Sequence, residues 1–120
     1  MKIAVCAQNP GKQSPVDPRF GRAKHFVIFD DTANTWETVD NAQNLNAAQG
    51  AGIQSASNIV NAGCGVLISG HCGPKAFSVL QKAGVVVYGT PAESTVEQAV
   101  AAYRTGTLKK LETADVERHW

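Results

Sequence analysis

Length, composition and charge restrict the chain to one ordinary globular domain. The chain has 120 residues, of which 43% are hydrophobic and 18% are charged. This length and composition are sufficient to bury a core, but the chain is too short for two domains. Eleven basic and ten acidic residues give a formal charge of +1, so there is no global positive field to hold nucleic acid or an anionic membrane surface. Any anion site must therefore be local.

The N-terminal residues and the cysteines favour a cytoplasmic protein. The apolar start MKIAVC is too short for the hydrophobic region of a signal peptide, and no later stretch approaches the length of a membrane span. The three cysteines, Cys6, Cys64 and Cys72, cannot all pair within one chain, and a domain of this size does not need disulfides. We therefore expect free thiols.

The first third of the sequence predicts three strands. An apolar run at residues 2–6 is followed by residues 8–22, whose glycines, prolines, serine and asparagine predict a long loop. Apolar and aromatic residues at 25–29 and 35–39 flank a polar turn, and this pattern predicts an antiparallel hairpin. The polar, asparagine-rich residues 40–49 then predict a linker.

The middle of the chain predicts a helix, a strand and a second helix. Apolar residues between 53 and 60 recur at helical spacing up to Gly63, which is typical of a C-terminal cap. The continuous apolar run at residues 66–68 is typical of a strand covered on both faces. Gly73 and Pro74 then open a helix that ends at Gly84.

The last part predicts one more strand, a third helix and a tail. Residues 85–88 predict the strand, and a capping box of Ser94 and Glu97 predicts the start of the helix. The predicted order is β-β-β-α-β-α-β-α, an α/β three-layer fold with a mixed five-stranded sheet and helices on both faces. We place one domain at residues 1–108 and a C-terminal tail at residues 109–120.

A loop between a strand and a helix carries the strongest functional signal. Gly73 at the cap and Pro74 at the first helical position leave first-turn N–H groups unpaired, with the positive end of the helix dipole behind them. Lys75 adds a positive charge that opposes the dipole unless an anion neutralises it. The alternative is a tight turn without function, because glycine and proline punctuate every fold of this class.

A basic cluster at the end of the first loop supports an anion site. Arg19, Arg22 and Lys24 fall in the short segment RFGRAK, and the loop leaves the first strand. A solvated loop that Phe20 fastens to the core would explain the same residues. The cluster therefore gains weight only if it lies near the Gly73-Pro74 turn.

Two thiols and a histidine can converge at the same edge. Cys6 ends the first strand and reaches Cys72 and His71 if the first and fourth strands are parallel neighbours. Cys64 lies ~16 Å away, at the opposite end of the fourth strand. Since no C-x-x-C spacing occurs, a closed zinc site is not supported.

Five segments, taken in order, resemble the dinitrogenase iron-molybdenum cofactor biosynthesis family of NifX-like proteins. They are MKIAVCAQ, SPVDPRFGRAKHFVIFD, GAGIQ, GVLISGHCGPKAF and VVVYGTPAESTVEQAVAAYRTG, and they span roughly residues 1–108. The resemblance implies a ribonuclease-H-like fold. Within the family the sequence is similar to the orange proteins of sulfate-reducing bacteria, which implies a non-covalently bound molybdenum-copper sulfide cluster or, alternatively, an iron-molybdenum sulfide cluster. Many members carry asparagine in place of His71, which leaves direct metal contact by His71 or Cys72 open.

A metal-sulfide cluster carries several negative charges and needs cations, N–H donors and an apolar wall. We expect a cytoplasmic monomer that carries the cluster between donor and acceptor proteins, which include ATPases. We expect no catalytic role and no binding to nucleic acid or to a membrane. The expected cofactor-binding residues are Cys6, Arg19, Arg22, Ser69, Gly70, His71, Cys72, Gly73, Pro74 and Lys75.

Three other functions compete with this interpretation. A nuclease requires several carboxylates at the sheet edge, and the first strand contains none. A thiol-dependent or persulfide-dependent protein would use Cys72, which lies near a helix start and Lys75, with His71 as its base. An anion sensor would use the Gly73-Pro74 helix start for phosphate or a similar ligand.

Overall fold

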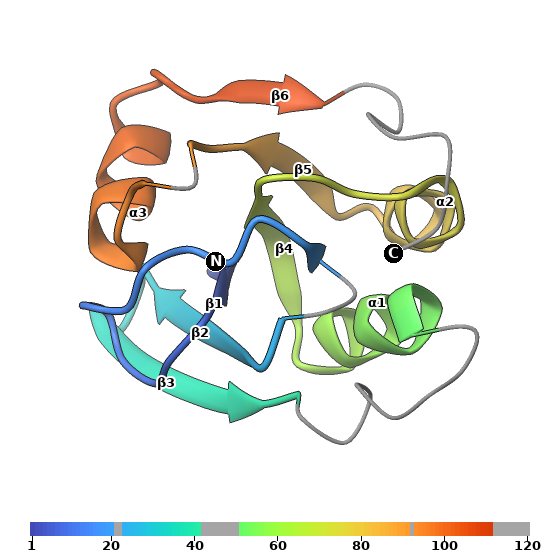
Figure 1. Cartoon of the computed structure of the whole chain (residues 1–120), viewed down its shortest axis with the longest axis horizontal. Coiled ribbons are helices and arrows are strands. Elements are labelled where there is room, and N and C mark those ends of the chain that lie inside the picture. Colours follow the sequence, from blue (N-terminus) through green and yellow to red (C-terminus); the bar gives the residue numbers. More distant parts are fainter. Residues whose placement is uncertain (21–22, 42–50, 92, 112–120) are drawn as a thin grey trace.

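A single mixed sheet with helices on both faces organises the protein (Figure 1). The computed structural model describes residues 1–20, 23–41, 51–91 and 93–111, and these form a sheet of six strands in the order β3-β2-β1-β4-β5-β6. The elements are β1 (Lys2–Ala7), β2 (His25–Asp30), β3 (Thr35–Asp40), α1 (Ala51–Asn61), β4 (Cys64–Ser69), α2 (Pro74–Lys82), β5 (Val86–Gly89), α3 (Val96–Arg104) and β6 (Lys109–Leu111).

The predicted order of eight elements is confirmed, but the prediction of a five-stranded sheet is wrong. A sixth strand, β6, pairs antiparallel with β5 through Leu111, Lys110 and Lys109. These three residues lie in the segment that we predicted to be a C-terminal tail. A strand pattern cannot be recognised there, because the segment is short and two of its residues are charged. Residues 112–120 lie outside the described residues, and the ribonuclease-H-like class stays a prediction.

The strand pairings explain why the apolar runs are continuous. The hairpin of β2 and β3 is antiparallel and β1 pairs parallel with β4, as predicted. Ala4 and Cys6 of β1 belong to the core cluster under α1 and α2, whereas Ile3 and Val5 belong to the cluster under α3. Figure 1 shows α1 and α2 on one face of the sheet and α3 on the other. Both faces of the central strands are therefore buried.

The connections bring two helix N-termini to the edge of the sheet where β1 and β4 end. Gly63, with a φ of 81°, follows α1 and leads directly into β4, so α1 begins near the far end of that strand. The next helix, α2, begins just after β4 ends. Because α1 and α2 pack against each other, the positive ends of their dipoles lie side by side.

The start of α3 differs from the prediction by one residue. The N-cap is Thr95, whose hydroxyl accepts from the Gln98 backbone at 3.2 Å, while the Gln98 side chain accepts from the Thr95 N–H at 3.0 Å. The predicted capping box of Ser94 and Glu97 is therefore wrong. Both frames satisfy the capping-box pattern, and the Ser94 carbonyl is used elsewhere, as the acceptor for the Val16 N–H at 2.9 Å.

No helix in the described ranges is long and apolar enough to cross a membrane.

Candidate functional site

The end of the first loop lies directly on the loop that follows β4. Arg19 forms an isolated parallel bridge with His71, and the Phe20 N–H donates to the His71 carbonyl at 3.3 Å. The Asp17 N–H donates to the carbonyl of Cys6 at 2.8 Å, which ties the same loop to the end of β1. The structure thus brings Arg19 to residues 69–75. In the sequence, the basic cluster and this loop were two separate signals.

Gly70 makes this close approach possible. A Cβ atom at Gly70 would lie 2.7 Å from Pro18 Cα and 2.8 Å from Pro18 O, distances that real Cβ atoms do not show. Since both atoms belong to the backbone, they cannot rotate away as a side chain would. A glycine is therefore required wherever the two loops cross, for steric reasons.

The start of α2 supplies N–H donors without a competing acceptor of its own. Gly73 is the N-cap and Pro74 follows it, and no side chain among the described residues caps this end. The N–H groups of Lys75 and Ala76 are therefore available to a ligand. The first turns of α1 and α2 contain no acidic residue, so nothing there offsets the positive ends of the two dipoles.

The cationic side chains at this edge face solvent. The Arg19 side chain is 52% exposed, and its Nε lies 3.9 Å from Asp17 Oδ1. Lys75 and His71 are also exposed. Arg22, the other predicted cation, lies outside the described residues. Arg19 and Lys75 therefore give the edge two accessible positive charges.

The predicted thiols converge as expected but lie below the surface. Cys6, Cys72 and Ser69 are each 0% exposed, and both cysteines belong to the core cluster that contains Phe20. Burial raises the pKa of the Cys6 thiol far above its ordinary value, and a hydrogen bond with Ser69 offsets this only in part. Cys6 is thus a neutral thiol in the interior, beneath the Arg19–His71 bridge.

Cys64 lies at the opposite end of β4, as predicted. It is paired with Lys2 at the start of β1, and burial raises the pKa of its thiol to about 11. Within the described ranges, no group of three or more histidine, cysteine or acidic side chains gathers that could hold a metal ion.

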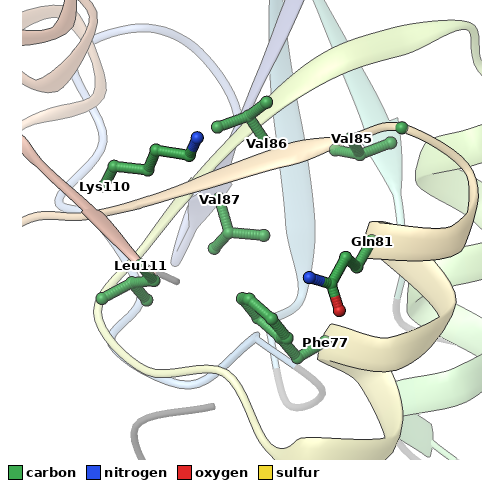
Figure 2. Close-up of a pocket in the computed structure, with 8 residues that line it drawn as sticks. Phe77, Gln81, Val85, Val86, Val87, Lys110 and Leu111 are labelled. Carbon is green, nitrogen blue, oxygen red and sulfur yellow. The ribbon is translucent and has the colours of Figure 1, made fainter. Parts of the chain in front are cut away.

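A groove of about 300 Å³ lies elsewhere, between α2 and the strands β5 and β6. Figure 2 shows Phe77, Val87 and Leu111 gathered around it, with Gln81 and Lys110 at its margins. The α2 residues that line it are Phe77 and Gln81, and not Pro74 or Lys75 at the start of the helix. The groove does not include the predicted site residues.

Sequence reasoning missed two polar residues that hold the edge in place. The buried Asp17 carboxylate accepts from the Arg19 N–H at 2.9 Å, and the order Asp-Pro was the signal for such a turn. The Asn41 side chain donates to the Ala23 carbonyl at 2.8 Å and to the Ser55 hydroxyl at 3.1 Å. Asn41 was assigned to a polar linker, and nothing local to it in the sequence predicts burial.

Comparison with known proteins gives a consistent set of relatives. The family model described as dinitrogenase iron-molybdenum cofactor matches residues 1–106. An uncharacterized protein of Methanocaldococcus jannaschii is 32% identical over 115 residues, which cover 93% of this chain and 92% of the relative.

Two solved structures are similar over nearly the whole chain. The apo form of the orange protein from Desulfovibrio gigas is 41% identical, with a TM-score of 0.93 and 96% of each chain covered. A putative NifB protein from Thermotoga is 32% identical, with a TM-score of 0.84 and 98% of each chain covered.

Proposed function

Since the chain belongs to the dinitrogenase iron-molybdenum cofactor family, we propose that it binds an anionic metal-sulfide cluster without covalent attachment and carries it between proteins. The proposed cargo is a molybdenum-copper sulfide cluster or, alternatively, an iron-molybdenum sulfide cluster. The protein acts as a monomer in the cytoplasm, receives the cluster from a donor and delivers it to an acceptor. It has no catalytic machinery of its own.

One observation carries this proposal: the loop crossing at residues 17–20 and 69–71 puts Arg19 beside an uncapped helix start that bears Lys75. Cationic side chains and backbone N–H groups are the donors that the sulfides of such a cluster accept from. Each charge-assisted hydrogen bond contributes about 1.5–3 kcal/mol, so a few of them hold an anion firmly and still release it. Arg22, by its sequence position, is proposed as a third cation.

The burial of the thiols supports electrostatic retention rather than direct ligation. Cys6 and Cys72 are each 0% exposed, so a cluster that bonded to their sulfur atoms would first have to open the packing that encloses them. The raised pKa of Cys6 also disfavours the thiolate that a metal ligand or nucleophile requires. His71, in contrast, is exposed and remains a candidate for contact with the cargo.

The test is retention of a reconstituted cluster by charge variants. The apo protein is loaded without oxygen with tetrathiomolybdate and copper(I), or with a preformed iron-molybdenum sulfide cluster, then desalted and assayed for metals and visible absorption. Arg19→Ala with Arg22→Ala, and separately Lys75→Ala, should lower retention roughly 10-fold to 100-fold, which is the effect of losing one or two charge-assisted bonds.

Lys82→Ala is the matched control, because Lys82 is an exposed lysine in the last turn of the same helix. It should retain the cluster like the wild type. Cys72→Ser should also retain it, whereas a thiol-dependent protein would lose function. Unchanged retention in the arginine double variant would overturn the proposal. An equal loss of retention in Lys75→Ala and Lys82→Ala would also count against it, because it would indicate a non-specific effect of charge.

A further inference from the structure

A buried carboxylate lies under the proposed anion site. Asp17 is only 5% exposed, and its backbone N–H donates to the Cys6 carbonyl at 2.8 Å, which places it at the end of β1. A negative charge at this position repels an anionic ligand, and a buried charge is costly unless a partner compensates it. The residue therefore needs an explanation that the proposed function does not supply.

The contacts of Asp17 converge on Arg19. Its Oδ1 accepts from the Arg19 N–H at 2.9 Å, which closes a turn around Pro18, and the same oxygen lies 3.9 Å from Arg19 Nε. Nε is the guanidinium nitrogen nearest to the carboxylate, so the four N–H bonds of the two terminal nitrogens remain for a ligand. The Asp17 carboxylate thus holds the Arg19 backbone by a hydrogen bond and lies close to the arginine's guanidinium group as an ion pair.

The rest of the loop is held on both sides of Arg19. Pro18 lies against Gly70 so closely that no Cβ would fit there, and Phe20 is 0% exposed and donates its N–H to His71. The Arg19 side chain is the part of this segment that reaches solvent, at 52% exposure. A long, rotamer-rich side chain in this setting loses less entropy on binding if it is already oriented.

We infer that Asp17 is a positioning residue that orients the Arg19 guanidinium toward the bound anion, an inference that rests on the proposed function. The turn and the Nε contact set the direction of the side chain before the ligand arrives. Orientation of one such side chain is worth roughly a threefold to tenfold gain in affinity. This gain outweighs the repulsion between the Asp17 carboxylate and the ligand.

A double-mutant cycle tests the inference, with tetrathiomolybdate as the probe and its visible absorption as the readout. Asp17→Ala should weaken binding roughly threefold to tenfold in the presence of Arg19. In the Arg19→Ala background the same substitution should weaken binding much less, because the turn around Pro18 then no longer orients a guanidinium. Glu37→Ala, which removes an exposed carboxylate on β3, should show no coupling with Arg19→Ala.

The outcomes separate the inference from the function on which it rests. An equal loss in both backgrounds, or tighter binding by Asp17→Ala while Arg19 is present, would overturn the positioning role. If Asp17→Ala does not fold, Asp17→Asn replaces it: asparagine keeps an acceptor for the Arg19 N–H but loses the charge that attracts the guanidinium, so a smaller coupling with Arg19→Ala is expected. If the wild type binds neither tetrathiomolybdate nor a preformed iron-molybdenum sulfide cluster, the proposed function falls and the inference falls with it.

Discussion

Replacement of Gly70 by alanine tests whether the crossing of the two loops holds the site together. The added Cβ would lie 2.7 Å from Pro18 Cα and 2.8 Å from Pro18 O, so one backbone segment must move. Forced overpacking of this kind costs about 1–3 kcal/mol. For a domain of this size, a loss of about 2 kcal/mol lowers the melting temperature by roughly 8 °C.

The assay is thermal unfolding followed by circular dichroism, with tetrathiomolybdate binding measured on the same variants. Gly65→Ala is the control, because Gly65 lies in the preceding strand and its Cβ would meet only the flexible Met1 side chain, at 3.6 Å. We expect Gly70→Ala to melt lower and to bind more weakly, while Gly65→Ala matches the wild type. Equal melting temperatures for the two variants would refute the steric argument.

Two further predictions concern stability. Burial raises the pKa of Cys64 from 9.0 to about 11, so the neutral thiol's contribution to the free energy of unfolding is complete below pH 9 and is lost as the pH rises through about 11. In urea unfolding between pH 8 and 11, the free energy of unfolding should fall more steeply for the wild type than for Cys64→Ala. Parallel curves for the two proteins would contradict this. Thr95→Ala should lower the free energy of unfolding by about 1 kcal/mol, whereas Ser94→Ala should have little effect on the urea midpoint. A larger loss of stability for Ser94→Ala than for Thr95→Ala would indicate that Ser94 is the N-cap.

Most of the fold could be predicted because its signals are local. The buried strands β1 and β4 are continuous apolar runs, and α2 begins at the Gly73-Pro74 pair, which restricts the backbone by itself. The short strand β6 could not be predicted, since Lys109 and Lys110 are exposed and the segment owes its conformation to pairing with β5. Edge strands of this kind depend on their neighbour rather than on their own pattern.

The sequence indicated which residues the candidate site contains, but not which of them are buried. Arg19 and Lys75 were identifiable as cations, and the structure brings their loops together. The enclosure of Cys6 and Cys72 depends on a core cluster that also contains Phe20 and other residues from distant parts of the sequence. The roles of Asp17 and Gly70 likewise arise only once the two loops cross.

The most direct test of the central claim is elemental analysis, with a visible absorption spectrum, of the protein purified without oxygen from its native source. We expect a coloured protein with stoichiometric molybdenum, together with copper or iron, and inorganic sulfide. A colourless, metal-free protein would contradict it and would favour a thiol-dependent or anion-sensing function at the same edge of the sheet.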